Sequence, residues 1–246
     1  MKKLNLFGFA IAILLVSFSS VKSQSVDDVI KKYLDAVGGV EAWKKVENMK
    51  QSGSLTMVTQ GGLNIKFNTM AARPNMTRQE GEFQGMKFIE SFDGTTAWTV
   101  NPFAGQKDPT KKSKDETDEA SKEAFEDEFI DYAAKGHQVE LMGTEEIDGT
   151  KAFKVKLTRK SADERIYFFD ATSYLPIMLR TVAQSGAAKG AITETYMSDY
   201  KKVGDVMIPH SIEQKMKGET QIIIKADVIE LNTKMAPKET FGFPSN

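Results

Sequence analysis

Apolar side chains near the start of the chain recur at the three- and four-residue spacing of an amphipathic helix. They are Val26, Val29, Ile30, Tyr33, Leu34 and Val37. Ser25 and Asp28 have the spacing of a capping box at its beginning, and Gly38 and Gly39 follow its end. The pattern therefore predicts a helix over 26–37. A short second helical turn over 41–46, with Trp43, is expected to continue the packing.

From Met49 the apolar period changes from helical spacing to two. Leu63, Ile65 and Phe67 alternate with polar residues, which is typical of a strand with one buried and one wet face. Asp93-Gly94 is a typical hairpin turn, and similar turns separate many of the later runs. Strand-like runs lie near 75–82, 84–92, 95–101, 138–146, 152–159, 164–170, 175–183, 191–201, 206–216 and 219–231. Short strands joined by tight turns indicate an antiparallel meander.

One segment, 106–128, interrupts this alternation because it is rich in charged and hydroxyl side chains. Its first half is expected to be a solvated loop. Near its end Phe125, Phe129 and Tyr132 are spaced i, i+4 and i+7, and Gly136 could end a helix. The pattern predicts a second amphipathic helix there, acidic on its outer side.

About ten strands with only two or three helices predict a mainly β fold. A sheet of that size is expected to curl into a strongly curved, half-open antiparallel barrel covered by a helical lid. Too few helices are present to fill the concave face, so the apolar interior is a candidate cavity. We expect one domain over 24–246.

The first 23 residues have the pattern of a cleaved secretory signal peptide. Lys2 and Lys3 precede an apolar run from Leu4 to Phe18, which is shorter than the roughly 20 residues of a membrane-spanning helix. The chain of 246 residues contains no Cys, so a lipidated cysteine after the signal is excluded. We therefore expect a soluble protein of the periplasm.

Composition and candidate chemistry narrow the function further. The net charge of −1 is not that of a nucleic-acid-binding protein. His137 and His210 are far apart, so no metal site or cofactor is expected. Neither a nucleophile elbow nor a phosphate-binding loop is present in the sequence. The acidic cluster around Glu145 is best interpreted as the solvated end of a hairpin. The sequence thus predicts a protein that is not an enzyme.

A set of short motifs suggests a family. Their order and spacing resemble those of LolA, the periplasmic carrier of outer-membrane lipoproteins: Arg73-Pro74-Asn75, Asp93-Gly94, Trp98 and Asn101-Pro102-Phe103. The resemblance implies a half-open barrel with an apolar cavity for acyl chains. It also implies that Arg73 hydrogen-bonds to the helical lid and holds the empty cavity shut. The chain is longer than a typical carrier, and the segment after Phe103 is unusually charged.

The resemblance implies a carrier of lipid acyl chains, with outer-membrane lipoproteins as cargo. Its partners would be an inner-membrane release complex and an outer-membrane acceptor. We predict that Arg73 is the lid latch, although a surface arginine at a strand end is the simpler alternative, and ordinary core packing is the alternative for Trp98. The predicted cavity residues are Leu63, Ile65, Phe67, Phe88 and Trp98 from the sheet, with Phe125 and Phe129 from the lid. The alternative function is a non-enzymatic envelope interaction or stress-sensing module with the same fold.

Overall fold

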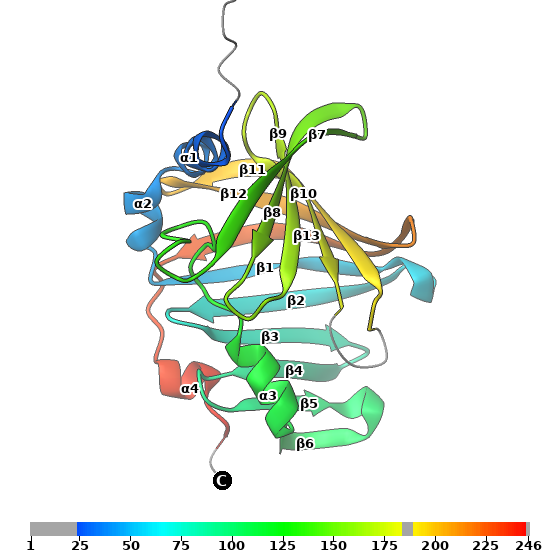
Figure 1. Cartoon of the computed structure of the whole chain (residues 1–246). Coiled ribbons are helices and arrows are strands. Elements are labelled where there is room, and N and C mark those ends of the chain that lie inside the picture. Colours follow the sequence, from blue (N-terminus) through cyan, green and yellow to red (C-terminus); the bar gives the residue numbers. More distant parts are fainter. Residues whose placement is uncertain (1–23, 184–188, 245–246) are drawn as a thin grey trace, which may run out of the picture.

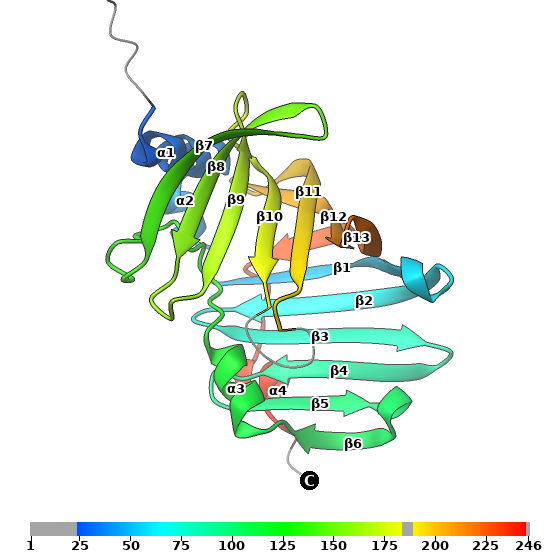
Figure 2. The same ribbon diagram turned by 45° about the vertical axis from the view of Figure 1, so that its right-hand side comes forward.

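The protein is an antiparallel sheet of 13 strands that curls around a concave inner face (Figures 1 and 2). The computed structural model describes residues 24–183 and 189–244, so the predicted signal peptide lies outside the described residues. The strands are β1 Asn48–Met57, β2 Leu63–Ala72, β3 Met76–Phe83, β4 Met86–Phe92, β5 Ala97–Asn101, β6 Gln106–Lys111, β7 Gln138–Ile147, β8 Thr150–Thr158, β9 Glu164–Asp170, β10 Pro176–Val182, β11 Ile192–Val203, β12 Val206–Met216 and β13 Glu219–Leu231. The predicted curved, half-open antiparallel sheet is confirmed.

The strand order is β6-β5-β4-β3-β2-β1-β13-β12-β11-β10-β9-β8-β7. Strands next to each other in the sequence are neighbours in the sheet, except that β1 pairs with β13 and that β6 and β7 form the two edges. The first six strands and the last seven therefore form two meanders joined at the β1–β13 pair. Figure 2 shows these meanders facing one another across the inner face.

A close approach of two backbones at the junction helps the sheet to bend. The β1–β13 register shifts between Ser52 and Gly53. A Cβ added at Gly53 would lie 1.9 Å from the carbonyl oxygen of Lys225 on β13. Only glycine fits there without moving the neighbouring backbone, and bulges of this kind increase local bending and twist.

The N-terminal helices form as the sequence predicts. Helix α1 spans Val26–Ala36, and both hydrogen bonds of its capping box between Ser25 and Asp28 are present. Helix α2 spans Val40–Lys44. The apolar stripe of α1 packs on the inner face of the sheet at β8 and β9, where Val29 and Ile30 join Val155, Leu157 and Phe169 in a buried cluster.

The charged segment after Phe103 differs from the prediction. Residues Gln106–Lys111 form edge strand β6 rather than a loop, and Lys114–Ser121 form helix α3, which begins with a capping box from Ser113 to Glu116. A further short helix, α4, spans Pro237–Phe241 near the end of the chain. The two single-turn 3-10 helices are η1 Val58–Gln60 and η2 Pro102–Ala104.

The predicted helix over Phe125 to Gly136 is not formed. Residues 122–136 are a succession of turns, which we name the covering segment. The side chain of Asp127 accepts a hydrogen bond from the backbone N–H of Phe129 at 2.8 Å, and Asp131 has φ of 51°. A side chain bonded to the backbone two residues on competes with helical hydrogen bonds, and a positive φ interrupts a helix.

Candidate functional site

Helices and the covering segment fill only part of the inner face. Around β8, β9 and β12 the space is solid core, with Tyr33 and Phe129 among the buried side chains at one point and Val46 and Val206 at another. Aromatic rings pack edge to face there, with the centroids of Tyr33 and Phe129 5.6 Å apart. The sheet surface in this half is therefore covered by the protein's own side chains.

The other half carries an apolar pocket, which we name the trough. It has a volume of about 630 Å³, within the range of small-molecule sites. Its walls come from β1 to β5, η1, η2 and β13. The lining residues are Leu55, Met57, Gln60, Leu63, Ile65, Phe83, Phe88, Asn101, Phe103 and Ile222. Eight of these ten side chains are hydrophobic, so the trough suits an apolar ligand.

Strand register explains why these side chains meet. Leu55 on β1 faces Ile65 on β2 and Ile224 on β13 in the antiparallel ladders, so all three point to the inner face. The ring of Phe88 lies over Gly81, where an added Cβ would be only 2.0 Å from the ring. The small residue on β3 thus leaves room for the large one on β4.

Four of the predicted cavity residues lie on this face. Leu63, Ile65 and Phe88 line the trough. Phe67 is buried on the same face, and Gly81 is its partner on β3.

Trp98 lies on the opposite face, which corrects its predicted place in the cavity. It pairs with Ser91 on β4, whereas Phe88 belongs to the alternate set of residues on that strand. Its indole N–H donates to the carbonyl oxygen of Phe241 in α4 at 2.8 Å, and Arg78 lies over its ring at 5.2 Å. With an exposure of 1%, Trp98 is core under α4.

Phe125 and Phe129 likewise do not line the trough. Phe129 is buried in the core cluster beneath α1, and Phe125 packs against the cluster around Val46. Because the covering segment forms turns, these two rings enter two different clusters instead of one helical stripe. The prediction that they contribute to the cavity from a lid helix is therefore corrected.

Arg73, the predicted latch, connects the sheet to two covering elements. Its Nε donates to the carbonyl oxygen of Val46 at 2.9 Å, and one Nη donates to that of Trp43 at 3.0 Å, both at the end of α2. The other Nη pairs with Glu126 of the covering segment at 2.9 Å. The guanidinium also lies over the ring of Phe125 at 5.6 Å. A surface arginine free of such contacts is excluded.

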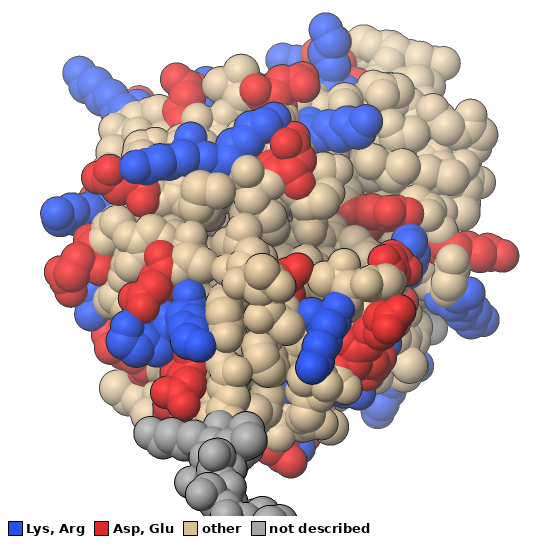
Figure 3. Space-filling model, turned by 90° about the horizontal axis from the view of Figure 1, so that it is seen from above, with Lys and Arg blue, Asp and Glu red and all other residues tan. Residues whose placement is uncertain are grey.

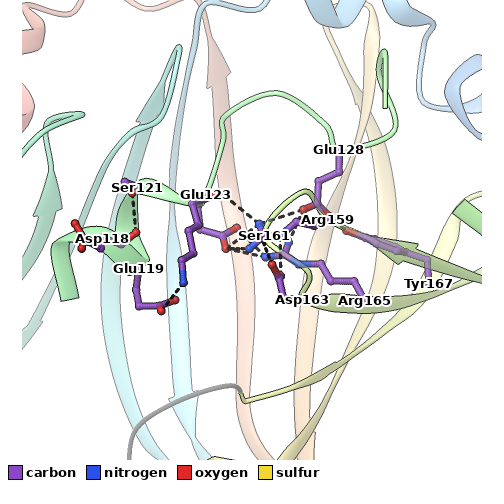
Figure 4. Close-up of polar contacts among 11 residues, drawn as sticks. Asp118, Glu119, Ser121, Glu123, Glu128, Arg159, Ser161, Asp163, Arg165 and Tyr167 are labelled. Carbon is purple, nitrogen blue, oxygen red and sulfur yellow. Dashed lines mark hydrogen bonds and ion pairs between the residues drawn. The ribbon is translucent and has the colours of Figure 1, made fainter. Parts of the chain in front are cut away.

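A second group of ion pairs fastens the covering segment to the sheet (Figure 4). Arg159, only 8% exposed, contacts Glu123 at 3.1 Å and Glu128 at 3.3 Å. Arg165 contacts the same two carboxylates, at 2.7 and 3.1 Å. Burial and the neighbouring charge of Glu128 raise the pKa of Tyr167, whose hydroxyl donates to Glu128 at 2.6 Å. The segment is thus held at several points.

Asp127 is the buried carboxyl of the covering segment. Burial raises its pKa, while hydrogen bonds from the Tyr33 hydroxyl and the Phe129 N–H oppose that rise. Glu126 behaves differently: burial opposes its ionisation, but hydrogen bonds from Lys135 and Arg73 outweigh it and lower its pKa. The pKa of Glu126 is therefore lowered while that of its neighbour Asp127 is raised, so that acidification changes the stability of the fold in opposite directions through these two carboxyls.

Other kinds of site are missing from the described part of the chain. No group of three His, Asp or Glu side chains in residues 24–183 and 189–244 could hold a metal ion. None of the helices described is both long and apolar enough to cross a bilayer. On the face seen in Figure 3, Lys and Arg side chains are interspersed with Asp and Glu.

Sequence reasoning missed part of the trough and most of the anchoring. Leu55 and Met57 alternate in β1, and Ile222 stands in an apolar run of β13, so a signal for these residues was present. The pairing of Arg159 and Arg165 with the covering segment had no sequence signal, because the partners are more than 30 residues apart.

Comparison with known proteins shows which fold this is. No protein-family model and no curated protein sequence matches the chain. An outer membrane lipoprotein-sorting protein domain from Vibrio parahaemolyticus is similar in structure, with a TM-score of 0.57 and 12% identity over 87% of this chain and 94% of that one. A LolA superfamily protein from Nitrosomonas europaea has a TM-score of 0.56 and 12% identity, covering 89% and 98%. A DUF1329 family protein from Desulfovibrio piger has a TM-score of 0.58 and 11% identity, also covering 89% and 98%. The resemblance that the sequence motifs suggested is thus confirmed in three dimensions, and the chain has a LolA-like fold.

Proposed function

We propose that this protein carries lipid acyl chains, including those of outer-membrane lipoproteins, through the periplasm with the acyl chains held in the trough. The observation that carries the proposal is the apolar pocket of about 630 Å³ on the part of the inner face that the helices leave open. The LolA-like fold supports it, because solved structures of this fold include a lipoprotein-sorting domain. No catalytic step is part of the proposal.

The energetics fit a carrier. Each CH₂ of an acyl chain costs about 0.8 kcal/mol in water, so a 16-carbon chain costs roughly 12 kcal/mol. Free diffusion of such a lipid is therefore excluded, and a wall of hydrophobic side chains offsets most of the cost. Because most of the lining side chains are partly exposed, their burial under an acyl chain adds to binding.

Arg73 would regulate access to the covered half of the inner face, and with it the space available to acyl chains beyond the trough. It bonds both α2 and the covering segment, so these elements move from the sheet only if its hydrogen bonds break. A closed resting state lowers the apparent affinity by the fraction of open molecules, which favours release. Under the proposal, cargo arrives from an inner-membrane release complex and leaves to an outer-membrane acceptor.

Adjacent residues of β13 offer a matched test. Ile222 lines the trough, whereas Ile223 is the next residue on the strand and points to the other face. Protein purified without detergent would be analysed by native mass spectrometry and by lipid extraction. We expect bound lipid in the wild type and in Ile223→Gln, and loss of most of it in Ile222→Gln.

Two outcomes would contradict the proposal. Equal lipid content in the two variants would show that the trough is not the binding site. A wild-type protein that carries no lipid but co-purifies with a stoichiometric protein partner would support the interaction module instead.

A further inference from the structure

Three turns at one end of the sheet expose large hydrophobic side chains. Among the described residues, seven large hydrophobic side chains are exposed, and three of them lie here: Val58 at 38%, Met86 at 38% and Phe103 at 51%. Val58 lies in η1, Met86 begins β4 directly after the β3–β4 turn, and Phe103 lies in η2. These three places lie at the same end of neighbouring strands in Figures 1 and 2. We name these three residues the rim.

The rim borders the trough directly. Phe103 is both half exposed and part of the trough wall, and its ring centroid is 6.2 Å from that of Phe83. Gln60 of η1 lines the same pocket. An apolar ligand entering at this end would pass from the rim into a pocket whose lining carries no charged side chain.

The charge pattern of these turns is unusual. Residues 58–62, 83–86 and 101–106 contain no charged side chain. Charges begin just behind the tips and are balanced there, since Lys87 pairs in register with Glu82 and Lys107 is followed by Asp108. Turns at the other end of the strands, by contrast, carry charged residues such as Asp93. The rim is therefore free of the desolvation cost that a charged tip would impose.

We propose that the rim docks on the surface of a lipid bilayer, with its three side chains inserted at the level of the upper acyl chains. This layering matches a bilayer, in which uncharged hydrocarbon is bordered by headgroups that carry both signs of charge. Insertion of apolar side chains from turns follows the same energetics as other interfacial contacts, which scale with the apolar area buried. The inference rests on the proposed function, because docking would place the trough mouth against the source of its acyl chains.

A composition-matched pair of double variants tests the docking. Val58→Ser with Met86→Ser removes two rim side chains that do not line the trough. Val228→Ser with Met142→Ser removes the same two residue types at exposed positions elsewhere, 50% and 45% exposed. Partition of the whole protein onto phosphatidylcholine vesicles would be measured by flotation, with and without phosphatidylglycerol. We expect about a tenfold loss for the rim variant and no loss for the control, with little dependence on phosphatidylglycerol.

Insertion itself can be observed at Phe103. The chain contains no cysteine, so Phe103→Cys or Val228→Cys provides a single thiol for an environment-sensitive dye. Vesicles should shift the emission of the dye to the blue at position 103 and leave it unchanged at position 228. Equal partition of both double variants, a dye that is unaffected at position 103, or a wild type that ignores vesicles would overturn the inference. Binding of a soluble fluorescent fatty acid without vesicles tests the trough separately, and the rim double variant should retain it.

Discussion

Replacing Arg73 by leucine should release the covering elements before it unfolds the sheet. The side chain is 24% exposed and makes two hydrogen bonds to carbonyls of the α2 end and an ion pair to Glu126. Hydrogen bonds from a charged group contribute about 1.5–3 kcal/mol each, and partial exposure reduces the ion pair. A total near 3 kcal/mol is therefore expected, which corresponds to roughly a hundredfold shift in the opening equilibrium.

Hydrogen exchange measured by mass spectrometry would localise this effect. Peptides covering 40–46 and 122–136 should lose about a hundredfold of protection in Arg73→Leu, while β12 and β13 keep theirs. Arg78→Leu is the matched control, because Arg78 bonds Glu80 and the Thr240 carbonyl on the other face. Unchanged protection in 122–136, or an equal loss throughout the sheet, would refute the latch. Lipid release measured in parallel should be slower in Arg73→Leu than in Arg78→Leu, because the closed state that favours release is less populated in Arg73→Leu.

Three further predictions follow from other contacts. Gly81→Val should push the ring of Phe88 into the trough, because an added Cβ would lie 2.0 Å from that ring; fatty-acid binding should fall severalfold while circular dichroism stays unchanged. Trp98→Phe should cost about 1–2 kcal/mol in urea unfolding through the lost hydrogen bond to α4, with fatty-acid binding retained. Glu126 has a lowered pKa in the folded state, so its ionised form stabilises the fold above the pKa of the unfolded carboxyl, and this stabilisation is lost as the pH falls through the folded pKa. Asp127 has a raised pKa, so its protonation as the pH falls favours the folded state. Between about pH 6 and about pH 3, Glu126→Gln should therefore lose less stability than the wild type and Asp127→Asn should lose more; equal slopes in urea titrations would contradict this assignment.

The fold was predictable wherever local pattern and tertiary environment agree. The capping box at Ser25 and the alternation of Leu63, Ile65 and Phe67 are local signals, and the structure forms α1 and β2 where they stand. The prediction of a loop after Phe103 is wrong, because solvent exposure alone does not distinguish a loop from an edge strand or a surface helix. The residues of β6 are exposed to solvent because β6 is an edge strand that pairs on one side only. Pro109 suits such an edge because it has no N–H to donate. The capping box at Ser113 was an available signal for α3.

The candidate site was harder to predict because it depends on which side of the sheet each residue faces. Leu63, Ile65 and Phe88 could be grouped by alternation within their strands, but the register between strands decides that Trp98 faces the other way. The spacing of Phe125 and Phe129 favours a helix, yet ion pairs to distant arginines fix the covering segment as turns. Such long-range contacts override local propensity, and a single sequence does not reveal them.

The strand order has a consequence for how the chain folds. Both meanders consist of hairpins between consecutive strands, so most pairings close short loops, but the seam between β1 and β13 joins the first strand to the last. Closing that seam carries the largest loop entropy of the sheet, and contacts of high sequence separation slow folding. While the polypeptide is being synthesised, the backbone N–H and C=O groups on one side of β1 therefore stay unpaired until β13 has been made. Truncations that remove β13 should leave the edge of β1 free to pair with another molecule. In the folded protein β13 therefore protects β1 from intermolecular pairing and aggregation.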